Sequence, residues 1–214
     1  MHRWFRRNFL EFCSKNSGFI PVKYPHTVFD FKDERNGKIG NEENKFATCC
    51  NYYLSFIPKN EWLIKIDCDH IYDSEKLKKI LKIITNDKDC IILPKLNIGE
   101  IKDNKVYLLK SRVFDETDDH WIIKNNNLKF KTIFIKDHWV EYLPLKGLNK
   151  KFTIVNNWHF PYIKKRRNEI KEEMIELSEW IKNNKEIIGK EISKDMLESN
   201  KIREILKNFE VYNG

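Results

Sequence analysis

The stretch of sequence that decides the fold reads Glu61-Trp62-Leu63-Ile64-Lys65-Ile66-Asp67-Cys68-Asp69-His70-Ile71-Tyr72-Asp73. An apolar run with β-branched members is typical of a buried strand, and this run ends in two aspartates spaced one residue apart. Open α/β sheets bind ligands just beyond the carboxyl ends of their strands. Two carboxylates there can hold a divalent cation, which can in turn hold a diphosphate. The stretch therefore predicts a site for a metal ion and a nucleotide sugar.

A second Asp-x-Asp triplet, Asp87-Lys88-Asp89, precedes the next apolar run instead of following one. Its position puts it on the side of the predicted sheet where turns are merely solvated. An Asp-x-Asp triplet alone is a weak motif, so only its position in the fold can distinguish a functional copy from a structural one. We expect the second triplet to be a surface loop and the first to be functional.

The segments on either side of the opening stretch alternate between helical and strand periodicity. Asp73 is the expected N-cap of the helix that follows it, rather than a third metal ligand. The other expected elements are a helix from Asn41 to Pro58, strands at 90–93, 129–136 and 152–155, a hairpin of 96–101 with 105–110, an apolar helix face from Ile170 to Ile181, and a last helix opening at Ser193. This order predicts an α/β fold with a mixed sheet flanked by helices.

The composition is that of a globular chain with a basic surface. The 214 residues are 41% hydrophobic and 34% charged, with a formal net charge of +8. No apolar run reaches the length of a membrane span and no signal-peptide pattern opens the chain, so a cytoplasmic location is expected. Five cysteines without a C-x-x-C pair indicate reduced thiols. The positive charge favours nucleic acid, an anionic bilayer or a diphosphate substrate, and does not choose among them.

Two further segments carry residues with possible chemistry. The acidic segment Asp115-Glu116-Thr117-Asp118-Asp119-His120-Trp121 is either a solvated loop or the source of a carboxylate that takes a proton from an acceptor hydroxyl. His159 follows the end of an expected strand and is either structural or a nitrogen ligand to the same cation. The basic run Lys164-Lys165-Arg166-Arg167 comes next.

Several segments also carry a resemblance to a known family: Glu11-Phe12-Cys13, 19–25, 42–45, 55–59, 61–70, and His159-Phe160-Pro161 with the basic residues after it. Over these segments the chain resembles bacterial lipooligosaccharide β-1,4-N-acetylgalactosaminyltransferases, nucleotide-sugar enzymes of the GT-A fold. The resemblance is specific from residue 11 to residue 82, sparser to 167 and weak beyond. Cys68 stands where the family usually has valine.

For the fold, the resemblance implies a GT-A-like domain over residues 1–163 and a helical basic tail over 164–214. The family has an N-terminal strand, helix and strand that the chain lacks. Because the first βα unit of such folds helps to hold the nucleotide base, the expectation is a fragment of a longer product or a crippled enzyme.

For the chemistry, the resemblance implies transfer of N-acetylgalactosamine from UDP to a galactose of a lipooligosaccharide outer core, with inversion. Asp69, supported by Asp67 and His159, would hold Mn²⁺ or Mg²⁺ on the diphosphate. The general base would be Asp119 or, as alternatives, Asp118 or Glu116. The residues expected to bind the nucleotide sugar are Asp67, Lys164, Arg166 and Arg167. The basic run Lys164, Lys165, Arg166 and Arg167 would face the diphosphate or a lipid surface.

Two rival functions remain open at this point. A metal-dependent nucleotidyltransferase also places two aspartates after a strand, but a basic groove with base-stacking aromatic residues is not recognisable here, so nucleic acid is not expected as a partner. The second rival is a non-catalytic remnant that binds the inner membrane peripherally or a protein partner. Binding of a nucleotide sugar separates the transferase from both.

Overall fold

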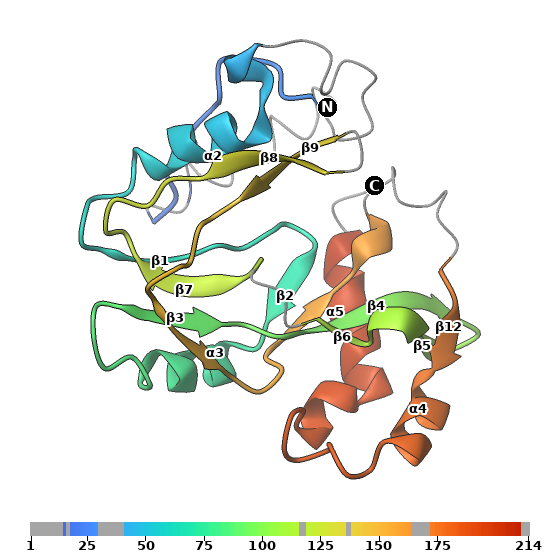
Figure 1. Cartoon of the computed structure of the whole chain (residues 1–214). Coiled ribbons are helices and arrows are strands. Elements are labelled where there is room, and N and C mark those ends of the chain that lie inside the picture. Colours follow the sequence, from blue (N-terminus) through green and yellow to red (C-terminus); the bar gives the residue numbers. More distant parts are fainter. Residues whose placement is uncertain are drawn as a thin grey trace. The chain divides into compact units, whose positions relative to one another are not determined.

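The computed structural model describes residues 15, 18–29, 41–115, 119–135, 138–163 and 172–210. The chain divides into two compact units, each described here by itself. An N-terminal unit takes residues 1–61 and 125–144, and a main unit takes residues 62–124 and 145–214 (Figure 1). Among the described residues, no helix has the length and the apolar character needed to span a membrane.

The N-terminal unit contains a short 3-10 helix, a helix and a hairpin. The elements are η1 (Glu42–Asn44), α2 (Phe46–Leu54), β8 (Lys131–Ile135) and β9 (His138–Tyr142), with β8 and β9 antiparallel. The side chain of Asn51 joins α2 to the hairpin, because its amide nitrogen donates to Phe130 O (2.9 Å) and its oxygen accepts from Phe130 N (2.8 Å). The predicted helix before Pro58 is confirmed, although α2 itself starts at Phe46.

The main unit has a first sheet with strand order β1-β7-β3-β10. Its strands are β1 (Trp62–Ile64), β7 (Trp121–Lys124), β3 (Asp89–Ile92) and β10 (Asn149–Phe152). Only β3 and β10 run parallel. Helix α3 (Ser74–Leu81) packs its Ile80 into the same core as Ile91 and Ile122. Asp73 caps this helix as predicted, since its Oδ1 accepts from Lys76 N at 3.1 Å.

A second sheet has strand order β12-β5-β4-β11-β2, with β6 paired to β4. Its strands are β12 (Met174–Glu176), β5 (Lys105–Leu109), β4 (Lys95–Lys102), β11 (Asn157–His159), β2 (His70–Tyr72) and β6 (Phe114–Asp115). The predicted hairpin is confirmed as β4 and β5. Asp103 and Asn104 form its two-residue turn with φ angles of 50° and 59°, which asparagine and aspartate tolerate better than other side chains. The fold is therefore mixed α/β, as predicted.

The two faces of the second sheet differ in polarity, because successive side chains of a strand point to opposite faces. Leu96, Trp158 and Ile71 pack into the larger core of the unit, where Trp158 Nε1 donates to Met196 O at 2.9 Å. The alternate residues of the same three strands are polar: Lys95, Asn97, Asn157, His159, His70 and Tyr72. This polar row lies across neighbouring strands and positions the candidate site.

The C-terminal part of the main unit differs from the prediction. The expected helix face from Ile170 to Ile181 is instead β12, which pairs with β5, followed by α4 (Leu177–Asn183). The last helix, α5 (Ser199–Glu210), begins six residues after Ser193, and the 3-10 helix η5 (Lys194–Leu197) precedes it. Residues 174–176 form a strand despite their helical periodicity, because they pair with the otherwise open edge of β5.

The second triplet was predicted to be a solvated loop, and this prediction is wrong for its last residue, Asp89. The Asp89 side chain is fully buried at the start of β3. Its Oδ2 accepts from Lys151 Nζ (2.8 Å) and from the backbone N–H groups of Thr85 (2.7 Å) and Asn86 (3.1 Å). Asp87 is exposed and pairs with Lys124. The second triplet is therefore a structural feature of the loop before β3.

We predict that Asp89→Asn lowers the midpoint of urea unfolding, whereas Asp87→Asn changes stability by no more than about 0.5 kcal/mol. The hydrogen bonds from Lys151 and from the backbone of Thr85 hold the pKa of Asp89 well below its ordinary value. A lowered folded-state pKa stabilises the protein above the unfolded-state pKa, and this stabilisation is lost as the pH falls through the folded-state pKa. The wild type should thus lose stability on acidification below about pH 4 more steeply than Asp89→Asn. Equal acid dependence would contradict this prediction.

Candidate active site around Asp67 and Asp69

Asp67 and Asp69 lie in the turn that joins β1 to β2. The turn is closed by His70 N, which donates to Asp67 O at 3.2 Å. Phe160 N donates to Asp69 O at 2.9 Å, so the backbone of the turn is also fixed to the end of β11. The Asp69 side chain is buried and that of Asp67 is half-buried. The first triplet therefore follows a strand, as the sequence indicated, and one of its carboxylates is removed from water.

Strand register brings His159 to Asp69. His159 is the last residue of β11, directly opposite His70 of β2 on one side and Asn97 of β4 on the other. Residues opposite each other in neighbouring strands share a face of the sheet. His159 Nε2 lies 3.1 Å from Asp69 Oδ2, and His159 Nδ1 lies 2.5 Å from Asn97 Oδ1. Sequence reasoning placed His159 just after a strand, whereas it belongs to the strand.

The hydrogen bonds of Asn97 determine which nitrogen of His159 carries its proton. The Asn97 amide nitrogen donates to Arg112 O at 2.6 Å, so its oxygen faces His159 Nδ1 and can only accept. Nδ1 is therefore the protonated nitrogen, and Nε2 of a neutral imidazole turns its lone pair toward the Asp69 carboxylate. A lone pair facing a carboxylate oxygen at 3.1 Å requires a proton or a cation between them. This arrangement fits a metal site.

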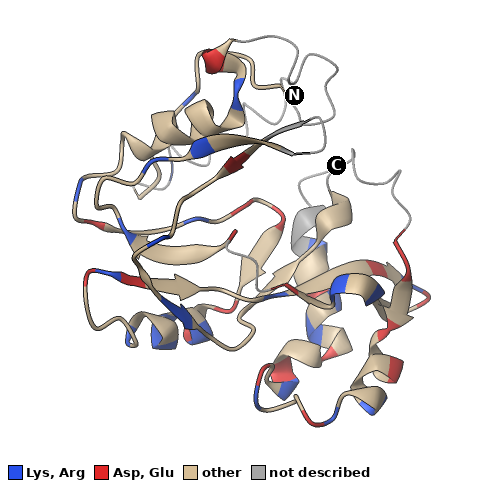
Figure 2. Cartoon of the chain, in the orientation of Figure 1, with Lys and Arg blue, Asp and Glu red and all other residues tan. Residues whose placement is uncertain are grey.

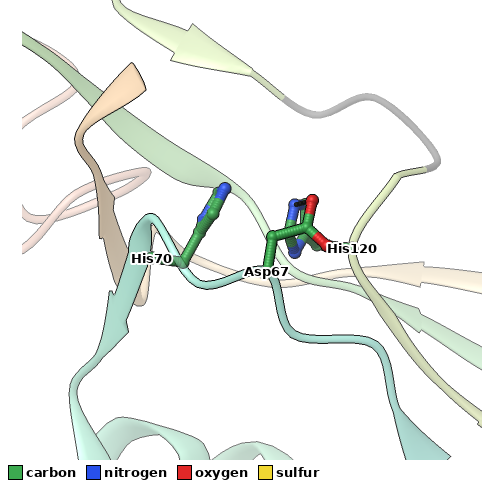
Figure 3. A group of neighbouring side chains, drawn as sticks. All are labelled: Asp67, His70 and His120. Atoms are coloured by element: carbon green, nitrogen blue, oxygen red, sulfur yellow. Dashed lines mark ion pairs between the residues drawn. The ribbon is translucent and has the colours of Figure 1, made fainter. Parts of the chain in front are cut away.

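Two histidines that the sequence analysis did not select lie beside the aspartates. The His70 ring stacks between His159, at 4.2 Å between ring centroids, and His120, at 4.0 Å. His120 Nε2 lies 3.7 Å from Asp67 Oδ2. Figure 3 shows Asp67 and His120 against each other, with His70 on the adjoining strand. The signal in the sequence was polar alternation in the buried strands and a histidine directly after the Asp-x-Asp triplet.

Both of these imidazoles are neutral at neutral pH. Burial, and then the positive charge that His120 and His159 would carry, lower the pKa of His70 to about 3. Burial also lowers the pKa of His120 to about 4, against the attraction of Asp119. Neutral imidazole is the form that binds metal ions.

Lys65 and Lys95 hold Asp119 at the edge of this cluster. Lys65 Nζ lies 2.9 Å from Asp119 Oδ1 and 3.3 Å from Asp67. The buried Lys95 ammonium lies 3.7 Å from Asp119 Oδ2 and 3.4 Å from Asp115 Oδ2. Burial raises the pKa of Asp119, but Lys65 outweighs that effect and the pKa falls to about 2. Asp119 is therefore ionised at neutral pH.

The donor set and its charge suit a divalent cation. Two groups have ligand atoms within 4.8 Å of one another: Asp67 with His70 and His120, and Asp69 with His70 and His159. Lys65 contacts Asp67 and Asp119, and Lys95 contacts Asp115 and Asp119. With Asp69, these described side chains are four carboxylates and two ammonium groups, a formal charge of −2. Figure 2 shows acidic colouring on the segments around the turn between β1 and β2.

The structure brings together four of the predicted site residues, namely Asp67, Asp69, Asp119 and His159. Asp119 reaches the triplet through Lys65, which contacts both Asp67 and Asp119. The other predicted site residues, Glu116, Asp118, Lys164, Lys165, Arg166 and Arg167, lie outside the described residues.

Comparison with known proteins identifies the family. The family model described as beta-1,4-N-acetylgalactosaminyltransferase (CgtA) matches residues 6–210, nearly the whole chain. No curated protein and no solved structure matches the chain. The family is one of transferases, which act on a sugar donor and an acceptor. The chain therefore belongs to the beta-1,4-N-acetylgalactosaminyltransferase (CgtA) family.

Proposed function

We propose that the chain transfers N-acetylgalactosamine from UDP-N-acetylgalactosamine to a galactose of a lipooligosaccharide outer core, with inversion and with a divalent metal ion. Membership of the family supports the sugar and the linkage. The observation that carries the metal dependence is the buried Asp69 carboxylate, which lies 3.1 Å from Nε2 of His159 while Nδ1 of the same ring faces Asn97. Without a cation or proton between them these two groups repel each other.

The residues that would hold Mn²⁺ or Mg²⁺ are Asp69, Asp67 and His159. When bound, the ion neutralises charge that develops on the diphosphate as it leaves. The chain's own residues then have two tasks. Asn97 fixes the tautomer of His159, and Lys65 holds the carboxylates of Asp67 and Asp119 in place and keeps the pKa of Asp119 low. Such outer hydrogen bonds orient ligands and tune their basicity.

The acceptor hydroxyl needs a carboxylate that takes its proton as the new bond forms. We propose Asp119 for this role, with Asp118 and Glu116 of the same acidic segment as alternatives. Asp119 is half-exposed and ionised, so it meets the first requirement of a base. The basic run 164–167 would bind the diphosphate or an anionic membrane surface, which would place the enzyme peripherally on the cytoplasmic face of the inner membrane.

The test is release of UDP from UDP-N-acetylgalactosamine in the presence of a galactose-terminated acceptor, with Mn²⁺, with Mg²⁺ and with EDTA. We expect acceptor-dependent UDP release that EDTA abolishes, and a β-1,4-linked product by nuclear magnetic resonance. Release of N-acetylgalactosamine 1-phosphate, with incorporation of UMP into a product, would point to a nucleotidyltransferase instead. Full activity in EDTA would overturn the metal dependence.

A further inference from the structure

His120 is a buried histidine whose Nε2 makes no hydrogen bond within the described part of the chain. Its other nitrogen, Nδ1, lies 3.0 Å from the hydroxyl of Tyr72. Nε2 is aimed at two carboxylate oxygens, 3.5 Å away on Asp119 and 3.7 Å away on Asp67, both beyond hydrogen-bond distance. A buried polar atom without a hydrogen bond costs about 1–3 kcal/mol, so it calls for an explanation.

His70 presents a second ring nitrogen, Nε2, to the same carboxylates. The Asn157 amide nitrogen donates to Pro94 O at 3.0 Å, so the Asn157 oxygen faces His70 Nδ1, 2.8 Å away, and accepts from it. Nδ1 thus carries the proton, and Nε2 of the neutral ring has a free lone pair. His70 Nε2 lies 3.9 Å from Asp69 Oδ1, and His70 belongs to both groups of potential ligands. Among the described residues, His70 is the one that the group around Asp67 and the group around Asp69 have in common.

We propose that His70 and His120, together with Asp67, are metal ligands, and that they make this a site for a nitrogen-preferring transition-metal ion rather than for Mg²⁺. The inference rests on the proposed function, because it assigns the class of the ion that acts beside Asp69. Mg²⁺ prefers six oxygens and keeps several waters, whereas imidazole suits Zn²⁺, Co²⁺ and similar ions. With three histidines beside two aspartates, the expected order of affinity is Zn²⁺ and Co²⁺ above Mn²⁺, and Mn²⁺ above Mg²⁺.

The test measures metal binding by the whole chain without nucleotide. Co²⁺ is titrated and its visible absorption recorded, because the intensity and position of this absorption change when protein ligands replace the water around the ion. We expect a saturable band that Zn²⁺ displaces and that a large excess of Mg²⁺ leaves in place. Displacement by Mg²⁺ at the concentrations at which Zn²⁺ acts would overturn the proposal.

Four variants assign the ligands. His120→Phe keeps the buried ring and removes both nitrogens, and we expect Co²⁺ affinity to fall by more than about 100-fold, the upper range for residues that only support a ligand. Asp67→Asn should weaken Co²⁺ binding similarly without loss of volume. Tyr72→Phe removes the partner of His120 Nδ1 and should cost about 10-fold. His26→Phe, at an exposed histidine of the N-terminal unit, should change nothing.

Cys68→Ser controls for Co²⁺ bound to the exposed thiol beside the two aspartates. Unfolding curves without metal show whether each variant is folded. If His120→Phe is folded and retains wild-type Co²⁺ affinity, the inference fails. If His120→Phe does not fold, the inference fails when both Asp67→Asn and Tyr72→Phe retain wild-type Co²⁺ affinity.

The inference and the proposed function can fail separately. Loss of the Co²⁺ band in His120→Phe, in a chain that never releases UDP, would sustain the metal site and overturn the transferase function of the chain. Metal-dependent UDP release, with Co²⁺ affinity unaltered in His120→Phe, would sustain the function and overturn the roles of His70 and His120.

Discussion

Asp69→Asn is expected to abolish metal-dependent binding of UDP while leaving the protein as stable as the wild type or more so. Asp69 is buried, and its Oδ2 faces the lone pair of His159 Nε2 at 3.1 Å. An asparagine amide can donate to His159 Nε2, so the variant keeps a hydrogen bond at this position worth about 1 kcal/mol. The same change removes the negative charge that a divalent ion needs. Stability and ligand affinity should therefore move in opposite directions.

Calorimetry of UDP with Mn²⁺ and with EDTA, beside thermal unfolding, tests this prediction. A carboxylate with a purely structural role would give the reverse result, since breaking a buried ion pair costs about 3–5 kcal/mol. Asp87→Asn is the matched control, because it makes the same chemical change on the exposed surface. Unaltered UDP affinity in Asp69→Asn, or equal affinity in EDTA, would exclude the proposed role.

The elements that the sequence predicted best are those whose signals are local. The strand before Asp67, the N-cap at Asp73 and the hairpin around Asp103 and Asn104 each depend on a few neighbouring residues. In each case periodicity or turn chemistry acts within one element. The Asp-x-Asp triplet could be placed for the same reason, because it directly follows a run that reads as a strand.

The candidate site could be predicted only in part because strand register assembles it. His70 and His159 are 89 residues apart in the chain and meet as opposite residues of β2 and β11. β2 has three residues, too few to show a periodicity, so the role of His70 was hidden. The prediction that Asp89 lies in a solvated loop was wrong for a related reason. Asp87 and Asp89 have the same spacing in the sequence as Asp67 and Asp69. Asp89 is structural because it is buried against Lys151, which lies 62 residues away on the neighbouring strand β10.

Asp119→Asn is expected to lower kcat with little change in the KM for UDP-N-acetylgalactosamine. A positioned base contributes about 10²–10⁴-fold to a rate, and it works best when its pKa lies near the operating pH. Because Lys65 holds the pKa of Asp119 near 2 against the effect of burial, the carboxylate is a weak base. The loss should therefore lie near the lower end of that range. Steady-state UDP release at saturating metal measures it.

A double-mutant cycle with Lys65 separates the base from a mere anchor, since Lys65 Nζ contacts Asp119 at 2.9 Å and Asp67 at 3.3 Å. Lys65→Met removes the ammonium but retains the carboxylate group of Asp119. If Asp119 takes the proton, Asp119→Asn should lower kcat much more than Lys65→Met does, because the accepting oxygen is lost only in the first variant. If Asp119 only positions Lys65, the two single variants and the double variant should lose the same activity, since all three remove the contact between Lys65 and Asp119. That equality would move the search for the base to Asp118 and Glu116.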